Sequence, residues 1–276
     1  MSVPAFADLL ERLVFTPGRN AKLALLRRWF ETQPDPERGL GLAALTDELV
    51  FTAAKPALVK GLVAERTDPV LLALSHDYVG DLAETVALIW PERPGVNAPP
   101  PDLSEVVETL EVTPKAELPA LIAGWLDTLD ASGRYALIKL LTGELRVGAS
   151  ARLTRLALAE WAARPVEEIE EVWHGVRPPY LPLFRWLEGK EERPDPRDAP
   201  VFRPLMLAHP LEDSDVAKLI PAEWRAEWKW DGIRVQIAAG PGGARMWSRT
   251  GEDVSDAFPR SRRASTSTPR WTASCW

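Results

Sequence analysis

AEWKWDGIR, residues Ala226 to Arg234, is the stretch from which this chain can be interpreted. The segment from residue 224 favours a strand that ends in a turn at Asp231-Gly232, and residues 233–239 alternate apolar and polar side chains as a second strand would. A turn over 241–243 then leads into a short strand over 244–248. Lys229 would therefore project from a strand end between two tryptophans, where loss of hydration lowers the pKa of an ammonium group. The alternative interpretation is an edge-strand lysine that discourages aggregation.

Two motifs in this region resemble those of a known family. Glu227-x-Lys229-x-Asp231-Gly232-x-Arg234 resembles the nucleotide-binding motif of ATP-dependent DNA ligases and related nucleotidyltransferases. The segment Ser248-Arg249-Thr250-Gly251-Glu252-Asp253 begins 14 residues after Arg234 and resembles the next motif of that family. Two motifs in the family order give a stronger indication than either alone.

The resemblance implies roles for single residues. Lys229 would be the catalytic nucleophile that attacks the α-phosphorus of ATP and keeps AMP on its nitrogen. Glu227, Arg234 and Arg249 would bind the nucleotide, and Mg²⁺ would assist the phosphate chemistry. AMP would then pass to the 5′-phosphate at a nick in duplex DNA, and the 3′-hydroxyl would displace it to seal the strand.

Composition limits the possible classes of protein. The chain has 276 residues, a formal net charge of −7, 46% hydrophobic residues and 26% charged residues, which is typical of a folded globular protein. A single cysteine, Cys275, excludes an internal disulfide framework and a cysteine-rich zinc site. No apolar run has the length of a membrane span, and no signal-peptide pattern precedes the first helix. We predict no metal-binding cluster of histidines and a cytoplasmic bacterial protein that works at the nucleoid.

The first two thirds of the sequence predict one helix after another. Apolar residues at helical spacing alternate with Pro- and Gly-containing breaks, and a proline-rich linker is expected over 91–101. The expected helical segments are 6–14, 23–30, 42–51, 56–64, 68–74, 80–90, 103–110, 118–129, 133–141, 150–163 and 166–173. A second proline-rich, charged stretch over 178–204 predicts a domain boundary between about 190 and 202.

Three segments of this helical part resemble the helical DNA-binding domain of larger ATP-dependent DNA ligases. They are Phe15-Thr16-Pro17-Gly18-Arg19-Asn20-Ala21-Lys22, Tyr78-Val79-Gly80-Asp81-Leu82-Ala83-Glu84-Thr85 and Lys139-Leu140-Leu141-Thr142-Gly143-Glu144-Leu145-Arg146-Val147-Gly148. The implied fold is multi-domain, α then α+β. An all-α helical DNA-binding domain (1–195) precedes the first strands of an antiparallel-sheet nucleotidyltransferase (adenylation) domain (196–259). Arg203-Pro204-Leu205-Met206-Leu207-Ala208 resembles the lead-in strand of that domain.

Charge is segregated in spite of the acidic total. Residues 131–165 carry six basic side chains and two acidic ones, which favours a local phosphate-binding face. Two glycines bracket Arg146, and Ser150 is expected to cap the next helix, whose N-terminus favours anions. The alternative is an ordinary solvated helix face with Gly143 as a C-cap. The predicted DNA contacts are Lys139, Arg146, Arg152 and Arg155.

The family resemblance ends near Pro259. Residues 260–276 read RSRRASTSTPRWTASCW, with no acidic residue and no apolar periodicity, and predict a disordered basic tail. Back-translation of residues 271–276, shifted by one base, permits Val/Leu-Asp-Gly-Glu-Leu-Leu, which resembles the next family motif. We therefore expect a truncated or frameshifted ligase that seals nicks poorly or not at all, and the gene sequence would test this.

Three function classes stay open at this point. An ATP-dependent DNA ligase acting as a monomer on nicked duplex DNA, without a membrane partner, is the first. A non-catalytic protein that binds nicks or DNA ends is the second. An RNA ligase or capping-type nucleotidyltransferase shares the lysine motif, but the helical N-terminal part counts against it. Roles in DNA repair, recombination and replication are all compatible with nick sealing.

Overall fold

The computed structural model describes residues 3–51, 55–93, 95, 97–143, 145–173, 175–194, 202, 210–224, 228, 231–240, 243–249, 251, 253–258 and 272–275. Its elements in chain order are α1 (Val3–Phe15), α2 (Arg19–Thr32), α3 (Glu37–Leu45), α4 (Pro56–Ala64), α5 (Pro69–Val79), α6 (Leu82–Ile89), α7 (Leu103–Val112), α8 (Leu118–Thr128), α9 (Ala131–Thr142), α10 (Ala151–Trp161), α11 (Val166–Trp173), α12 (Leu181–Leu187), α13 (Asp213–Val216), β1 (Arg234–Gly240), β2 (Gly243–Ser248), a 3₁₀ turn (Ser255–Ala257) and β3 (Thr272–Cys275).

The chain divides into two compact units. The first comprises Met1–Ile169 and Arg177–Glu192, and the second comprises Glu170–Val176 and Arg193–Trp276. Among the described residues the first unit is built of α-helices, and the second contains an antiparallel sheet. The coarse prediction of a helical part followed by antiparallel strands is confirmed. No helix in the described ranges is long and apolar enough to cross a membrane.

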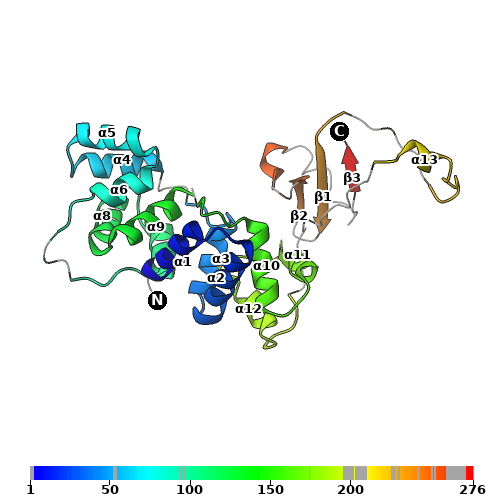
Figure 1. Cartoon of the computed structure of the whole chain (residues 1–276), viewed down its shortest axis with the longest axis horizontal. Helices are drawn as coiled ribbons and strands as arrows, with labels where there is room; N and C mark the ends of the chain where they lie inside the picture. Colours follow the sequence, from blue (N-terminus) through cyan, green and yellow to red (C-terminus); the bar gives the residue numbers. More distant parts are fainter. Residues whose placement is uncertain are drawn as a thin grey trace. The chain divides into compact units, whose positions relative to one another are not determined.

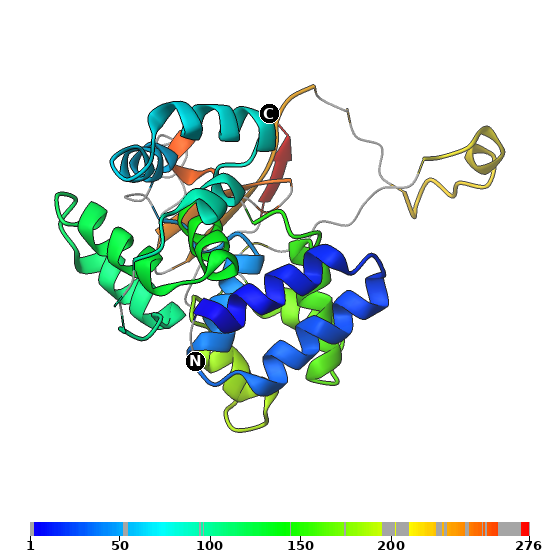
Figure 2. The same cartoon turned by 60° about the vertical axis from the view of Figure 1, so that its left-hand side comes forward.

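The first unit consists of two helical groups that meet at α9 and α1. Figures 1 and 2 show α4, α5, α6 and α8 grouped at one end, and α2, α10 and α12 grouped at the other. Helix α9 packs on α6 in the first group and on α1, which in turn contacts α2. Its apolar residues Leu137, Ile138 and Leu140 are at most 1% exposed, so α9 is the shared core helix of the unit.

Helix α3 is buried along its whole length, which is unusual for a helix that begins with two charged residues. Two of its glycines permit close packing. A Cβ added at Gly39 would lie 1.7 Å from the carbonyl oxygen of Pro179, and a Cβ at Gly41 would lie 2.6 Å from the Trp29 ring. The backbone before α12 therefore approaches α3 so closely that only glycine, which has no side chain, fits at position 39.

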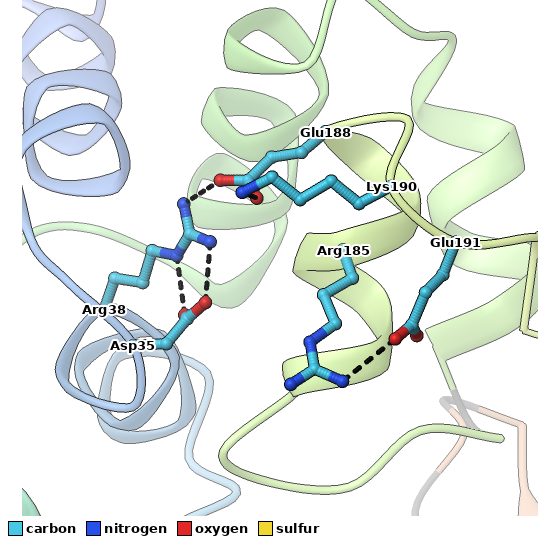
Figure 3. A network of polar contacts seen from close by, with 6 residues as sticks. All are labelled: Asp35, Arg38, Arg185, Glu188, Lys190 and Glu191. Atoms are coloured by element: carbon cyan, nitrogen blue, oxygen red, sulfur yellow. Dashed lines mark hydrogen bonds and ion pairs between the residues drawn. The ribbon is translucent and has the colours of Figure 1, made fainter.

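The two charged residues at the start of α3 are satisfied by specific partners. The Arg38 guanidinium donates to both carboxylate oxygens of Asp35 at 2.7 and 2.8 Å and to Glu188 at 2.6 Å (Figure 3). It also stacks 4.3 Å from the centroid of the Phe184 ring. The hydrogen bond from Arg38 lowers the pKa of Glu188. This network fastens α12 to α3, and it explains why the helical unit continues to Glu192.

Glu37 binds a helix that is far from it in the sequence. Its buried carboxylate accepts hydrogen bonds from the backbone N–H groups of Leu103 and Ser104, at 2.9 and 3.0 Å. These are N–H groups of the first turn of α7, which lack partners inside their own helix. Glu37 thus caps α7 from another helix.

The second unit contains a three-stranded sheet in the order β2-β1-β3, with both pairs antiparallel. Ala238 on β1 and Trp247 on β2 form a small buried cluster with Phe202, whose ring centroid lies 6.3 Å from that of Trp247. The chain after β2 folds back on it, because Val254 donates to the Met246 carbonyl at 2.8 Å.

Several bounds differ from those predicted. The helix expected over 42–51 runs from Glu37 to Leu45, since Pro36 permits an earlier start and the buried network holds residues 37 and 38 in place. Helix α12 lies in the stretch predicted as a proline-rich boundary. Thr272–Cys275 form β3 where a disordered tail was expected, because backbone pairing with β1 needs no apolar periodicity. The strand expected over 224–230 lies mostly outside the described residues, and the lead-in strand expected over 203–208 lies entirely outside them.

Candidate nucleic-acid and nucleotide sites

The first and third ligase-like segments are brought together by one contact. Lys22 on α2 donates from its Nζ to the carbonyl oxygen of Gly148 at 2.8 Å, although the two residues lie 126 positions apart. Gly148 has a φ of 67°, and an added Cβ would lie 2.4 Å from the Lys22 Nζ. The left-handed backbone therefore favours glycine here, whereas the end of the lysine side chain is flexible and can move aside.

Helices α2 and α10 begin at this same place. Lys22, in the first turn of α2, contacts Gly148, which lies three residues before α10 begins. Arg27 and Glu160 approach to 3.7 Å nearer both C-termini, so the helices run in the same direction. Ser150 caps α10 by accepting from the Leu153 N–H at 3.2 Å, as predicted. Gly18 at the start of α2 provides no side-chain cap. Two positive helix ends therefore lie beside a lysine, which is an arrangement that favours a phosphate.

The second and third segments are joined by a buried ion pair. Asp81 uses one carboxylate oxygen to cap α6, accepting from the Glu84 N–H at 2.9 Å, and pairs through the other with the Lys139 ammonium. Burial alone would raise the pKa of Asp81, but the hydrogen bonds from Lys139 and from backbone N–H groups outweigh it and lower that pKa. The pair thereby holds the end of α9, where the loop with Arg146 begins.

We expect Asp81→Asn to destabilise the first unit by about 2 kcal/mol at pH 7, because asparagine keeps the cap but leaves the buried ammonium without its anion. The lowered pKa of Asp81 means that the pair stabilises the fold above about pH 4 and that this contribution is lost as the pH falls through the folded-state value. Urea unfolding of wild type and variant at pH 7 and pH 3 measures both effects.

Asp68→Asn is the matched control for this experiment. Asp68 also caps a helix, α5, by accepting from the Val70 N–H, but it is exposed and forms no ion pair with a described residue. Its replacement is expected to change the unfolding free energy by less than about 0.5 kcal/mol. Equal losses in the two variants, or a difference that does not become smaller between pH 7 and pH 3, would contradict a stabilising role for the Asp81–Lys139 pair.

The predicted basic face is smaller than the sequence suggested. Lys139 is 4% exposed and is paired with Asp81, so its predicted contact with DNA does not fit the structure. Arg134 is buried and donates to the Leu126 carbonyl at 2.9 Å, and Arg164 pairs with Glu168. Long cationic side chains in a basic segment can thus bind polar groups inside the protein instead of facing solvent. A count of charges along the sequence does not distinguish the two cases.

The remaining predicted DNA contacts lie near the hydrogen bond from Lys22 to Gly148. This place, where α2, α10 and the loop with Arg146 meet, is called the Lys22 junction below. Arg146 is exposed on its loop, and the neighbouring Val147 is 1% exposed and anchors that loop. Arg152 is exposed in the first turn of α10, while Arg155 is half-buried one turn later. Lys22 lies beside these residues but was not among the predicted contacts, although the segment that contains it resembles the family.

The nucleotide-binding candidates lie at one end of the β1–β2 hairpin. The last antiparallel pair at this end joins Val235 to Ser248. Arg234 and Arg249 come one residue further out on the two chains, and both are exposed. Strand alternation assigns both to the face of the Phe202–Trp247 cluster. Two arginines opposite each other repel, so an anion between them would relieve the repulsion.

The second motif forms a tight turn on β2. Gly251 has a φ of 90° and donates to the Ser248 carbonyl at 3.1 Å. Asp253 pairs with Arg245 at 2.9 Å, and its carboxylate accepts from the Ser255 N–H at 3.0 Å. The turn therefore holds Arg249 at the hairpin end.

Lys229 and Glu227 lie outside the described residues, so the structure gives their roles no geometry. Asp231 and Gly232, which are described and exposed, connect that stretch to β1. The hairpin end has the cationic character that ATP phosphates require. For Mg²⁺, the described residues contain no group of three or more His, Cys, Asp or Glu side chains that could hold a metal ion.

Comparison with known proteins gives independent information on ancestry. A model of the ATP dependent DNA ligase domain matches residues 205–270. A probable DNA ligase of Anaeromyxobacter sp. (strain Fw109-5) is 34% identical over 52% of this chain and 28% of its own length. A DNA ligase of Pyrobaculum arsenaticum is 28% identical over 71% of this chain and 36% of its own length. A probable DNA ligase of Anaeromyxobacter dehalogenans (strain 2CP-C) is 26% identical over 94% of this chain and 48% of its own length. The chain thus spans less than half the length of each of these relatives.

Proposed function

Because this chain belongs to the ATP-dependent DNA ligase family, we propose that its first unit binds nicked duplex DNA and that its second unit carries the lysine that accepts AMP from ATP. The observation that carries the DNA-binding part is the junction where α2, α10 and the loop with Arg146 meet. The nucleotide part is supported by the paired arginines at the hairpin end.

At the junction, the contacts available to DNA are contacts to phosphates. The N–H groups at the starts of α2 and α10, the Lys22 ammonium and the Arg146 guanidinium are all hydrogen-bond donors of the kind that bind phosphates. Such groups position a duplex without reading its sequence, as an enzyme that acts on any nick requires. We propose that the chain binds as a monomer, in the bacterial cytoplasm, and acts in repair, recombination or replication wherever nicks arise.

In the proposed reaction, the neutral amine of Lys229 attacks the α-phosphorus of ATP. A nitrogen–phosphorus bond forms, the bond from that phosphorus to the pyrophosphate oxygen breaks, and pyrophosphate leaves with the electron pair while the amine loses a proton. Arg234 and Arg249 hold phosphate oxygens, and Glu227 contacts the adenine side. Mg²⁺ bound to the nucleotide would neutralise phosphate charge. Transfer of AMP to the 5′-phosphate and sealing by the 3′-hydroxyl complete the proposed sequence.

A second candidate function is binding of nicks or DNA ends without catalysis. It is favoured by the fact that every residue of the Lys22 junction belongs to the first unit. DNA binding by these residues requires no contribution from Lys229, so the two activities can be tested separately.

We expect Lys22→Ala to weaken binding to nicked duplex by about tenfold and to reduce the slope of log K against log salt concentration by about one, because one fewer phosphate is neutralised. Fluorescence anisotropy over a salt series measures both quantities. Arg146→Ala should act in the same direction.

Lys60→Ala is the control, since Lys60 is an exposed lysine on α4, away from the junction. Its replacement should leave the affinity and the salt slope near those of wild type. Wild-type affinity in the Lys22 and Arg146 variants would contradict the assignment of DNA binding to this junction.

A further inference from the structure

The exposed side of α2 borders an open hollow beside the end of α10. Its volume of about 680 Å³ is within the range of ligand pockets, which is about 300–1,000 Å³. Five residues of α2, all exposed, and the half-buried last residue of α10 line it. These are Ala24, Arg27, Arg28, Glu31, Thr32 and Trp161.

Arg28 gives the hollow a cation that is available to a binding partner. Arg27 approaches Glu160 to 3.7 Å, whereas Arg28 forms no ion pair with any residue that the structure describes. Its backbone carbonyl accepts a hydrogen bond from the Thr32 hydroxyl at 2.8 Å, so that hydroxyl is already used within α2. The helix carries four basic residues and one acidic one. The charge of this surface therefore favours an anionic partner.

Trp161 gives the hollow a fixed apolar wall. Its ring packs against the core, with centroids 6.4 Å from Phe30 and 5.8 Å from Phe184. Ala24, on the opposite helix, is small and leaves space beside the ring. An aromatic surface that is already held in place loses little conformational entropy when an apolar side chain covers it.

The acidic residues of the site favour a peptide over a nucleic acid. Glu31 lines the hollow, and Glu160 is nearby on Arg27. Both would repel a row of phosphates, whereas a peptide can donate a backbone N–H to Glu31 and place a carboxylate on Arg28. Positions 24 to 32 extend about 12 Å along α2, which is the length of about four residues of extended peptide.

We propose that this hollow binds a short extended segment of a partner protein, with acidic side chains that pair with Arg28 and an aromatic side chain that packs on Trp161. The site lies toward the C-terminal ends of α2 and α10, whereas the Lys22 junction lies at their N-terminal ends. The proposal therefore does not rest on the DNA binding proposed above, and one chain can hold DNA and a protein partner together.

Three labelled and end-blocked tetrapeptides test the chemistry, by fluorescence anisotropy against the full chain. Asp-Phe-Asp-Leu should bind. Asp-Ala-Asp-Ala should bind about tenfold more weakly, because it lacks the apolar contact with Trp161. Lys-Phe-Lys-Leu should bind at least about fivefold more weakly, because its charge has the wrong sign for Arg28.

Variants of exposed residues then locate the peptide. Arg28→Ala should bind Asp-Phe-Asp-Leu about fivefold more weakly, and Arg28→Glu should bind Lys-Phe-Lys-Leu about fivefold more tightly than wild type does. Ala24→Gln should weaken Asp-Phe-Asp-Leu by about fivefold, since a longer side chain occupies the space beside Trp161. Lys60→Glu, on α4 in the other helical group, is the control and should leave all peptide affinities unchanged (Figures 1 and 2).

Three results would overturn the inference. One is equal binding of the three peptides. The second is wild-type affinity for Asp-Phe-Asp-Leu in both Arg28→Ala and Ala24→Gln, because the peptide would then bind elsewhere. The third is displacement of the peptide by a single-stranded oligothymidylate whose own binding requires Arg28, which would assign the hollow to nucleic acid. Nicked-duplex binding by Arg28→Ala should match wild type, so failure of this proposal leaves the Lys22 junction untouched.

Discussion

Replacing Lys229 with alanine is expected to abolish transfer of label from α-labelled ATP to the protein, a loss of roughly 10⁴-fold or more, because no other group takes the place of a covalent nucleophile. Lys229→Arg should be equally inactive, since a guanidinium stays protonated and is a poor nucleophile. The measurement is acid-labile label on the purified chain after incubation with ATP and Mg²⁺, because a phosphoramidate is cleaved in acid.

Lys218→Ala is the control in the same unit. Lys218 is exposed and pairs with Asp215 at 3.1 Å, so its loss should leave labelling unchanged. Label on the Lys229 variants at the wild-type level would contradict the assigned nucleophile. Absence of label from wild type, together with salt-dependent binding of nicked DNA, would favour the non-catalytic DNA-binding function.

Gly39→Ala is expected to destabilise the first unit by about 3 kcal/mol or more, the largest stability change predicted for a single methyl group here. The added carbon would lie 1.7 Å from the Pro179 carbonyl oxygen, which is backbone and cannot rotate away. Helix α12 would have to move off α3 and would strain the bond from Arg38 to Glu188. Thermal unfolding followed by circular dichroism should show a decrease in Tm of roughly 6–12 °C.

Gly61→Ala is the matched control, because Gly61 lies within α4 and a Cβ added there meets no atom within 4 Å. Alanine should stabilise that helix by about 0.5–1 kcal/mol through its higher helix propensity. Equal effects of the two substitutions would show that α12 does not approach α3 as closely as described.

The sequence predicted most helices of the first unit because their apolar residues repeat at helical spacing and their ends carry local signals. Ser150 was predicted as a cap and Gly143 was a C-cap in the alternative interpretation, and both are caps in the structure. The spacing predicted a helix over 42–51 but not its start at Glu37, because the buried charges at that start depend on Asp35, Glu188 and the first turn of α7. Glu188 and α7 are distant in the chain from these charges, so no local pattern indicates those contacts.

The same distinction separates the site residues. Lys139 and Arg146 lie in one basic segment and look equivalent in sequence, yet the first is buried against Asp81 and the second is exposed. Asp81, the acid that pairs with Lys139 and so makes the two residues differ, is 58 residues away from Lys139 in the chain. Arg234 and Arg249 lie at one hairpin end because the strands expected over 233–239 and 244–248 pair across the predicted turn, and strand register follows from that turn.

The cap that Glu37 provides to α7 has a consequence for chain connectivity. The start of α7 is held by Glu37 and by the Val3 N–H, which donates to the Pro101 carbonyl at 2.8 Å. Neither group belongs to the linker over 91–101 that leads into α7, so the helix keeps its place independently of that linker's length. Doubling a flexible loop costs only about 0.6 kcal/mol in closure entropy. Inserted residues between α6 and α7 are therefore accommodated at little cost, which makes this linker the natural position for a label or a grafted domain.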